Sequence, residues 1–359
     1  MTLSTKLTEL LGIDFPIIQA GMAGGTTTPS LVSAVCNAGG LGTLGAGYMS
    51  PLQMREAIKE IRQHTNRPFA VNLFIPEPID EQALSKVQRV NQVMKKFRDQ
   101  LGIVESQITK FTESFEDQLE VVLEEKVPIF SFTFGIPSTE ILQALKRNQT
   151  IIIGTATTVN EAIELEARGV DAIVGQGSEA GGHRGTFGGE FEDSLIGTMA
   201  LIPQMVDHVK VPVIASGGIM DGRGLLASLA LGAEGVQMGT AFLTCPESGA
   251  HAEHKRAILG SNEQSTVLTR SFSGKPARGI KNKFISEMEQ HAEIIPSYPV
   301  QNALSKDIRS AAGKQNQTDC MSLWAGQGVR LSKSKTAEEI VRDVVNQTID
   351  LLGKIQSRN

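Results

Sequence analysis

VPVIASGGIMDGRGLLASLALGAEGVQMGT, residues 211–240, contains two apolar runs separated by a glycine turn and a helical pattern. Neither apolar run alternates with polar residues, which favours strands that are covered on both faces of a parallel sheet. Asp221 precedes the helical pattern as a cap, and Gly232 follows it. The stretch therefore predicts a strand, a crossover helix and a second, parallel strand.

The same unit repeats along the chain. Six further apolar runs bring the number to eight, which are FPIIQA from Phe15, GLGTLG from Gly40, FAVNLF from Phe69, IFSFTF from Ile129, TIIIGT from Thr150, AIVGQG from Ala172, VPVIAS from Val211 and GVQMGT from Gly235. Helical patterns lie between them. Eight repeats predict an α/β TIM (β/α)8 barrel that closes near residue 243, with a doubly wound open sheet as the alternative.

Two stretches interrupt this rhythm. We expect residues 1–245 to form the barrel, with a mostly helical insertion at 76–128 that is longer than a normal crossover. Residues 246–320 form a smaller, mostly helical segment that would cover the substrate. Residues 321–359 contain an amphipathic helix that would return to the barrel wall.

Composition excludes several classes of protein. Apolar residues make up 40% of the 359 residues and charged residues 20%, which is ordinary for a globular protein, and no apolar run approaches the ~20 residues of a membrane span. The net charge of -5 argues against nucleic-acid binding. The N-terminus lacks a signal-peptide pattern, so we expect a cytoplasmic protein with a small-molecule partner and no membrane association. The sequence does not distinguish a monomer from a homodimer.

Metal and disulfide sites are not expected. Cys36, Cys245 and Cys320 have no CxxC spacing and are odd in number, so we interpret them as reduced thiols. His251 and His254 have the i,i+3 spacing of metal ligands but no third ligand nearby. We therefore predict no metal site.

The loops that follow the strands carry the chemistry of a barrel enzyme. Glycine turns follow strands seven and eight, SGGIMDGRG and QMGT, and backbone amides in such turns can bind a phosphate. Gln19 to Met22, Asn72 and Gln176 would meet at the barrel axis, where amides and backbone groups suit the polar edge of a flat heterocycle such as isoalloxazine. Each of these positions is weak evidence alone, since Asn72 can equally be a capping residue.

The loop GQGSEAGGHRGTFGG, residues 175–189, places one histidine, His183, among many glycines. The glycines would let the backbone pass close to a cofactor, and His183 could donate a hydrogen bond to an anion or act as a base when neutral. The alternative is a histidine that only hydrogen-bonds to a neighbouring strand. Arg184 and Glu179 could form a structural ion pair at the rim.

The motifs IIQAGMAGG, NAGGLGTLGAG, NLF, GSEAGGHRGTF, ASGGIMDGRG, LALGAEGVQMGTAFL and SYPVQNALSK together resemble the class I nitronate monooxygenases, once called 2-nitropropane dioxygenases. The resemblance implies an FMN-dependent flavoprotein that oxidises alkyl nitronates, such as propionate 3-nitronate, with O2 to a carbonyl compound and nitrite, without NAD(P)H or a metal. It assigns His183 as the catalytic residue and Tyr298 and Lys306 as substrate-binding residues. The FMN contacts that it implies are Ala20, Gly21, Met22, Asn72, Gln176, Gly181, Gly182, Ser216, Gly217, Gly218, Gln237, Met238, Gly239 and Thr240.

Tyr298 and Lys306 are expected on one helix that begins at Pro299, about two turns apart. If this helix caps the barrel, Lys306 would neutralise an anionic substrate and Tyr298 would donate a hydrogen bond. The alternative is a solvated lysine beside a packed tyrosine.

Three other functions fit part of the pattern. An FMN-dependent enoyl-acyl-carrier-protein reductase shares the barrel, the phosphate loops and an AGGH segment, but it would need NAD(P)H. Enzymes that resemble the IMP dehydrogenases and reductases share the phosphate loops, but they use a cysteine after strand six, where this chain has none. The third is a flavin-binding sensor or storage protein without turnover.

Overall fold

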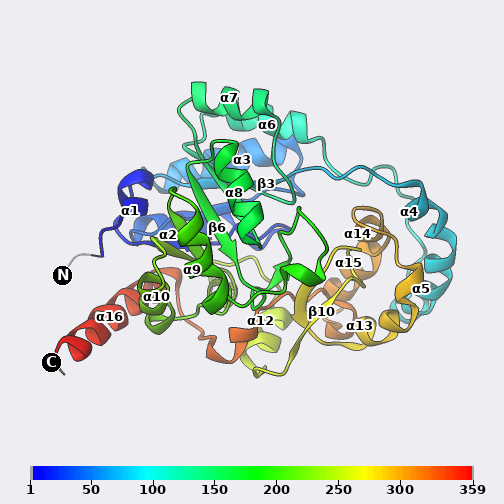
Figure 1. The fold of residues 1–359 in the computed structure, drawn as a ribbon. Coiled ribbons are helices and arrows are strands. Elements are labelled where there is room, and N and C mark those ends of the chain that lie inside the picture. Colours follow the sequence, from blue (N-terminus) through cyan, green and yellow to red (C-terminus); the bar gives the residue numbers. More distant parts are fainter. Residues whose placement is uncertain (1–2, 358–359) are drawn as a thin grey trace.

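The computed structural model describes residues 3–357 and contains a parallel eight-stranded barrel (Figure 1). Its strands are β1 (Ile17–Gln19), β2 (Thr43–Gly45), β3 (Ala70–Phe74), β4 (Ile129–Thr133), β5 (Ile151–Ala156), β6 (Ala172–Gln176), β8 (Val213–Ser216) and β9 (Gly235–Met238). Neighbouring strands pair in parallel in the order β1-β9-β8-β6-β5-β4-β3-β2. The eight predicted strands and the TIM barrel are confirmed.

The barrel is closed between its first and second strands. Ile18 pairs with Leu41 in a parallel bridge, and the buried Gln19 side chain spans the same gap. Its Nε2 donates to the Thr43 carbonyl at 3.2 Å, and its Oε1 accepts from the Thr43 amide at 3.1 Å. The alternative of an open doubly wound sheet, in which the two edge strands stay apart, is therefore wrong.

Helices cover the outside of the barrel as the predicted crossovers. They are α2 (Pro29–Asn37), α3 (Pro51–His64), α6 (Phe115–Glu124), α7 (Thr139–Arg147), α8 (Val159–Ala167), α9 (Thr198–His208), α10 (Gly222–Ala230) and α16 (Ala337–Gln356). The last helix lies between α10 and α2 and so completes the ring. The short helix α1 (Lys6–Leu11) places Leu7 and Leu11 against the apolar side chains inside the barrel, such as Ile18 and Ile214.

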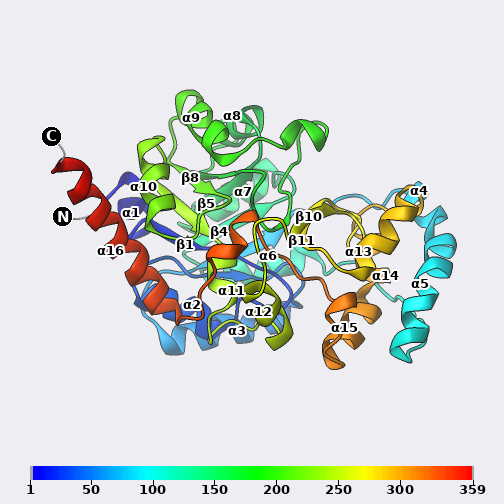
Figure 2. The same ribbon diagram turned by 90° about the horizontal axis from the view of Figure 1, so that it is seen from below.

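A second apolar core lies beside the barrel. It brings together α4 (Glu81–Ser85) and α5 (Val87–Leu101) with a later part of the chain that contains α13 (Lys283–Met288), α14 (Val300–Leu304) and α15 (Lys306–Lys314). Both ribbon views show this helical group next to one side of the barrel (Figures 1 and 2). Within the predicted insertion 76–128, α4 and α5 join this group, whereas α6 packs on the barrel against α3.

A small antiparallel sheet joins the two cores. Strands β10 (Thr266–Thr269) and β11 (Ala277–Ile280) pair with each other, and β11 also pairs with β7 (Gly182–His183), which belongs to the glycine-rich loop after β6. The helix α12 (Ala252–Leu259) precedes this sheet. No helix within residues 3–357 is both long enough and apolar enough to cross a membrane.

Candidate active site

A cavity of about 560 Å³ lies where the carboxyl ends of the barrel strands face the helical group. This volume falls within the roughly 300–1,000 Å³ that ligand and cofactor pockets span. One wall is made by the loops after β1, β6, β8 and β9, and another by Asn302, Arg309 and Ser310 of the helical group. The glycine turns that contain Gly217 and Gly239 therefore open onto the same space.

The residues predicted to contact a flavin are brought together around this cavity, with one exception. Met238 is buried in the barrel core and does not line the cavity. Those that line it are Ala20, Gly21, Met22, Asn72, Gln176, Gly181, Gly182, Ser216, Gly217, Gly218, Gln237, Gly239 and Thr240. They come from five separate loops or strand ends, so the barrel alone assembles this wall.

The turn after β8 has the geometry of an anion-binding site. Gly217 has φ 122° and Gly218 φ 69°, in the left-handed region that favours glycine. Within the described chain, the amide N–H groups of these two residues have no acceptor, so they are free to donate to a ligand in the cavity. A Cβ at Gly217 would lie 2.8 Å from Thr198 Oγ1, so the turn has no room for a side chain. Unpaired backbone donors around a side-chain-free turn fit the phosphate of FMN.

Two amide side chains that line this wall, those of Asn72 and Gln176, also form hydrogen bonds within the protein. Asn72 Nδ2 donates to Ser131 Oγ at 2.9 Å. Gln176 Nε2 donates to the His183 carbonyl at 3.1 Å, and its Oε1 accepts from the Gly185 amide at 2.8 Å. Gln176 therefore holds the glycine-rich loop in place besides lining the cavity.

His183 lies in β7, where it pairs with Ala277 of β11. Its ring lies among Phe134, Tyr298 and Trp324, with centroid distances of 5.9, 6.3 and 5.3 Å. Its Nε2 is 2.8 Å from Ser273 Oγ. Burial, then the positive charges of Lys275 and Arg309, lower the pKa of His183 to about 3, so the ring is neutral at physiological pH.

Arg309 is a cation without a carboxylate partner in the part of the chain that the structure describes. Its NH2 donates to the Asn302 carbonyl at 2.6 Å and its Nε to Ser305 Oγ at 3.1 Å. Burial lowers the pKa of its guanidinium. Tyr48 Oη, which is also buried, has no partner among the described residues, although Tyr48 lines the cavity too. A half-buried cation without a carboxylate partner and a buried hydroxyl group at the same cavity favour an anionic ligand.

The positions of Tyr298 and Lys306 differ from the predicted single helix. The helix breaks at Ser305, which ends α14 and caps α15. Tyr298 is buried beside His183 and does not line the cavity, and burial raises the pKa of its phenol. Lys306 is exposed and does not line the cavity. Arg309, one turn after Lys306, lines the cavity instead.

Arg184 and Glu179 do not form the predicted ion pair at the rim. Arg184 is fully buried, and its guanidinium donates to the carbonyl groups of Gly177, Gln176 and Ser194. The carboxylate of Glu179 instead accepts from the amide and the hydroxyl group of Thr198. Both side chains therefore hold the backbone of the loop.

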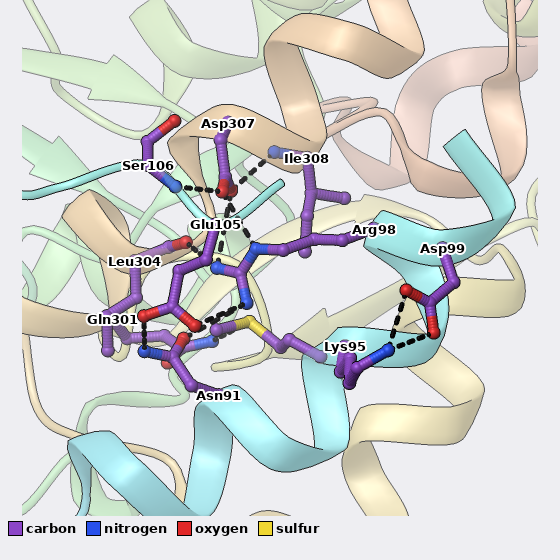
Figure 3. Close-up of polar contacts among 11 residues, drawn as sticks. Asn91, Lys95, Arg98, Asp99, Glu105, Ser106, Gln301, Leu304, Asp307 and Ile308 are labelled. Carbon is purple, nitrogen blue, oxygen red and sulfur yellow. Dashed lines mark hydrogen bonds and ion pairs between the residues drawn. The ribbon is translucent and has the colours of Figure 1, made fainter. Parts of the chain in front are cut away.

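The side of the cavity made by α15 is anchored to α5 through Arg98 (Figure 3). Its Nε donates to Asp307 Oδ2 at 2.8 Å, and its NH2 donates to the Leu304 carbonyl at 3.0 Å. Asp307 also accepts from the Ser106 amide at 3.2 Å. The early insertion thus holds the helix that carries Arg309.

Sequence reasoning missed several residues of the site. Tyr48, Phe134, Arg309 and Trp324 line the cavity, and Ser273 and Lys275 adjoin His183. Of these residues, only Arg309 could have been found from the sequence, because it lies three residues after Lys306 in a segment already singled out.

The two histidines with metal-like spacing have other roles, since His251 caps α12 and His254 Nε2 is 3.0 Å from the Trp324 carbonyl. Within residues 3–357 no three His, Cys, Asp or Glu side chains are grouped to hold a metal.

Comparison with known proteins places this site in a family. The family model described as Nitronate monooxygenase matches residues 4–347. The chain belongs to the nitronate monooxygenase family. It is therefore an oxidoreductase of a flavin-dependent family, as the resemblance of its motifs implied.

Individual members of the family and solved structures are similar to this chain over nearly its whole length. A probable nitronate monooxygenase from Staphylococcus saprophyticus is 48% identical over 359 residues, which cover 99% of this chain and 100% of the relative. The structure of a nitroalkane oxidase from Streptomyces ansochromogenes is similar with a TM-score of 0.90 and 38% identity, over 97% of this chain and 99% of that one. FabK from Thermotoga maritima is similar with a TM-score of 0.78 and 32% identity, over 99% of both chains.

Proposed function

We propose that this protein is an FMN-dependent enzyme that oxidises alkyl nitronates with O2 to a carbonyl compound and nitrite, without NAD(P)H. In this reaction the C–N bond breaks, the carbon gains one oxygen atom of O2 as its carbonyl oxygen and nitrogen leaves as nitrite, so that one O2 balances the oxidation of two nitronates. The observation that carries the proposal is the single cavity that joins the free amides of Gly217 and Gly218 to a neutral His183 and an unpaired Arg309.

FMN would be held at its phosphate by the turns at Gly217, Gly218 and Gly239. The residues after β1, together with Asn72 and Gln237, would contact its ring system. When bound, FMN would supply the electron transfer between substrate and O2. The loop that carries Gly181 and Gly182 lies in the same wall, where small residues leave room for the cofactor.

The substrate would lie between the cofactor and the helical group. Arg309 supplies the positive charge that a nitronate anion requires, and the hydroxyl group of Tyr48 is the nearby donor. Lys275, whose ammonium group is ion-paired with Glu77, adjoins His183. His183 would contact the reacting group. We assign Arg309, in place of the exposed Lys306, to a second negative group such as the carboxylate of propionate 3-nitronate.

The test is the absorbance spectrum of the purified protein before and after anaerobic mixing with propionate 3-nitronate. We expect the spectrum of a bound oxidised flavin and its change on mixing, followed by recovery and nitrite release when O2 is admitted. A bound flavin whose spectrum does not respond to any nitronate would contradict the proposal and favour the sensor or storage function.

The likeness to FabK favours, as a second candidate, the FMN-dependent enoyl-acyl-carrier-protein reductase. The same preparation separates the two candidates. Oxidation of NADPH that depends on a crotonyl substrate would support the reductase, whereas nitronate turnover in the absence of NADPH supports the monooxygenase. The cytoplasmic location stays a prediction.

A further inference from the structure

Ser273 lies in the turn between β10 and β11, directly beside the imidazole of His183. It is 2% exposed, and its Oγ is 2.8 Å from His183 Nε2. The same Oγ donates to the Lys275 carbonyl at 3.1 Å and accepts from the Lys275 amide at 3.3 Å. The Ser273 hydroxyl group therefore has three hydrogen-bond partners, which are the His183 ring and the carbonyl and amide groups of Lys275.

Counting protons assigns the direction of each bond. A serine hydroxyl group has one proton to donate and two lone pairs that accept. The Lys275 carbonyl can only accept, so it takes the single proton, and the Lys275 amide can only donate, so it uses one lone pair. The remaining lone pair faces His183 Nε2, which must then carry a proton.

We propose that Ser273 is a positioning residue that fixes His183 as the Nε2–H tautomer and leaves the lone pair of Nδ1 to the substrate. This inference rests on the proposed function for the identity of the substrate, but the tautomer itself does not. Nitronate chemistry by itself does not determine which ring nitrogen of His183 carries the proton. The hydrogen bonds of Ser273 determine it.

The other ring nitrogen is available to a ligand. Within residues 3–357, Nδ1 of His183 has no hydrogen-bond partner. It is not sealed from solvent, as the buried side-chain atoms without a partner are. It therefore faces the cavity that His183 lines. Phe134, Tyr298 and Trp324 pack around the ring, and the charged groups near it are Arg309 and Lys275, which is ion-paired with Glu77. Burial first, and then the two cations, keep the ring neutral, with one proton.

The tautomer separates two kinds of substrate. A neutral Nε2–H histidine can accept a proton at Nδ1 but cannot donate one into the cavity. With a neutral nitroalkane, the carbon–hydrogen bond would break, its electron pair would stay on the substrate as the nitronate, and the proton would move to Nδ1. The negative charge that forms would offset Lys275 and Arg309 and so stabilise the imidazolium. A nitronate supplied directly needs no such transfer, and its oxygen atoms would bind to Arg309 and the hydroxyl group of Tyr48.

The direct test is 15N NMR of the FMN-bound protein labelled at histidine, with the signals of His183 identified by their loss in His183→Asn. We expect a protonated Nε2 and an unprotonated Nδ1 in the wild type. Ser273→Ala should reduce the Nε2–H population, and Ser273→Thr, which keeps the hydroxyl group, should restore it. Ser271→Ala is the matched control, because Ser271 is buried in the same segment but contacts Thr269 and not His183. It should leave the His183 signals unchanged.

Kinetics provide the second readout. Ser273→Ala should lower kcat/KM for neutral nitroethane about tenfold or more, since general-base catalysis contributes roughly 10²–10⁴-fold. Turnover of ethyl nitronate should fall by a smaller factor than turnover of nitroethane, a difference that a merely structural defect would not produce. A wild type with the proton on Nδ1, or a Ser273→Ala variant with an unchanged tautomer, would overturn the inference. If the tautomer is as expected but no nitronate is oxidised, the proposed function fails and the role of Ser273 stands.

Discussion

The guanidinium of Arg98 and the carboxylate of Asp307 form an ion pair of 2.8 Å in which the two side chains are 4% and 7% exposed. The pair connects α5, from the insertion before β4, with α15, which follows the barrel by more than sixty residues in the chain. Arg309 lies two residues after Asp307 and lines the cavity. The insertion therefore supports the helix that borders the proposed substrate site (Figure 3).

Removal of one partner of this buried pair should destabilise the protein. We expect Arg98→Met to lower the free energy of unfolding by about 3–5 kcal/mol, because the carboxylate of Asp307 stays buried without its partner. Lys95→Met, on the same helix, is the control. The Lys95–Asp99 pair is 70% and 60% exposed, so its loss should cost less than about 1 kcal/mol. Urea denaturation of both variants measures the difference, and equal costs would contradict a supporting role for Arg98.

Arg309→Met and Lys306→Met should affect substrate binding very differently. Loss of a hydrogen bond to a charged group costs about 1.5–3 kcal/mol, which is roughly a 10- to 150-fold increase in KM for propionate 3-nitronate in Arg309→Met. Ethyl nitronate, which lacks the carboxylate, should show a smaller increase. Because Lys306 is exposed and outside the cavity wall, Lys306→Met should change KM less than twofold. Steady-state kinetics with both substrates decide between the two residues, and the reverse ranking would return the role to Lys306.

Gly217→Ala should impair retention of FMN. The new Cβ would lie 2.8 Å from Thr198 Oγ1 in a backbone with φ 122°, and such crowding typically costs about 1–3 kcal/mol. The turn would have to move away from the phosphate. The measurement is the ratio of flavin to protein after gel filtration, together with circular dichroism to confirm folding. Gly353→Ala, at an open position in α16, is the control and should keep the wild-type ratio. Full flavin content in Gly217→Ala would place the phosphate elsewhere.

The activity of His183 should be insensitive to pH across the neutral range. Its pKa is lowered to about 3, so the neutral ring, which can accept a proton, persists as the pH falls through the ordinary value of 6.5. We therefore expect no loss of kcat/KM for nitroethane from this group between pH 8 and pH 5. A pH profile with an acid limb near 6.5 that disappears in His183→Asn would show that the ring becomes charged in that range.

The same pKa shift should make stability depend on pH. Below about 6.5 the unfolded chain binds a proton at this histidine, whereas the folded protein does not until about pH 3. The free energy of unfolding should therefore fall as the pH drops through this window, by about 1.4 kcal/mol per pH unit from this one group. Denaturation of His183→Asn between pH 6 and pH 4 should show a slope reduced by that amount. An unchanged slope would mean that the ring is not held neutral.

Sequence alone was sufficient for the barrel and for one wall of its cavity. The eight apolar runs, the glycine turns and the helix caps are local signals, because each depends on residues within a few positions of one another. The carboxyl ends of parallel strands must meet at one face, so the residues after β1, β3, β6, β8 and β9 could be grouped before any coordinates were known. Met238 is the exception, because it is buried in the core and does not line the cavity.

The other wall of the cavity, made by the helical group, could not be predicted from the sequence. It forms through contacts between segments far apart in the chain, and local sequence patterns do not record such contacts. Packing of the helical group placed Arg309 at the cavity and left Lys306 exposed, and the antiparallel pairing of β7 with β11 brought Ser273 and Lys275 to His183, ninety residues away in the case of Ser273. The charge state and the tautomer of His183 follow from burial and from these neighbours. Local sequence determined what the strands and turns are, whereas tertiary packing determined which charges and hydrogen bonds surround the reacting group, because electrostatic interactions depend on distance in space and not along the chain.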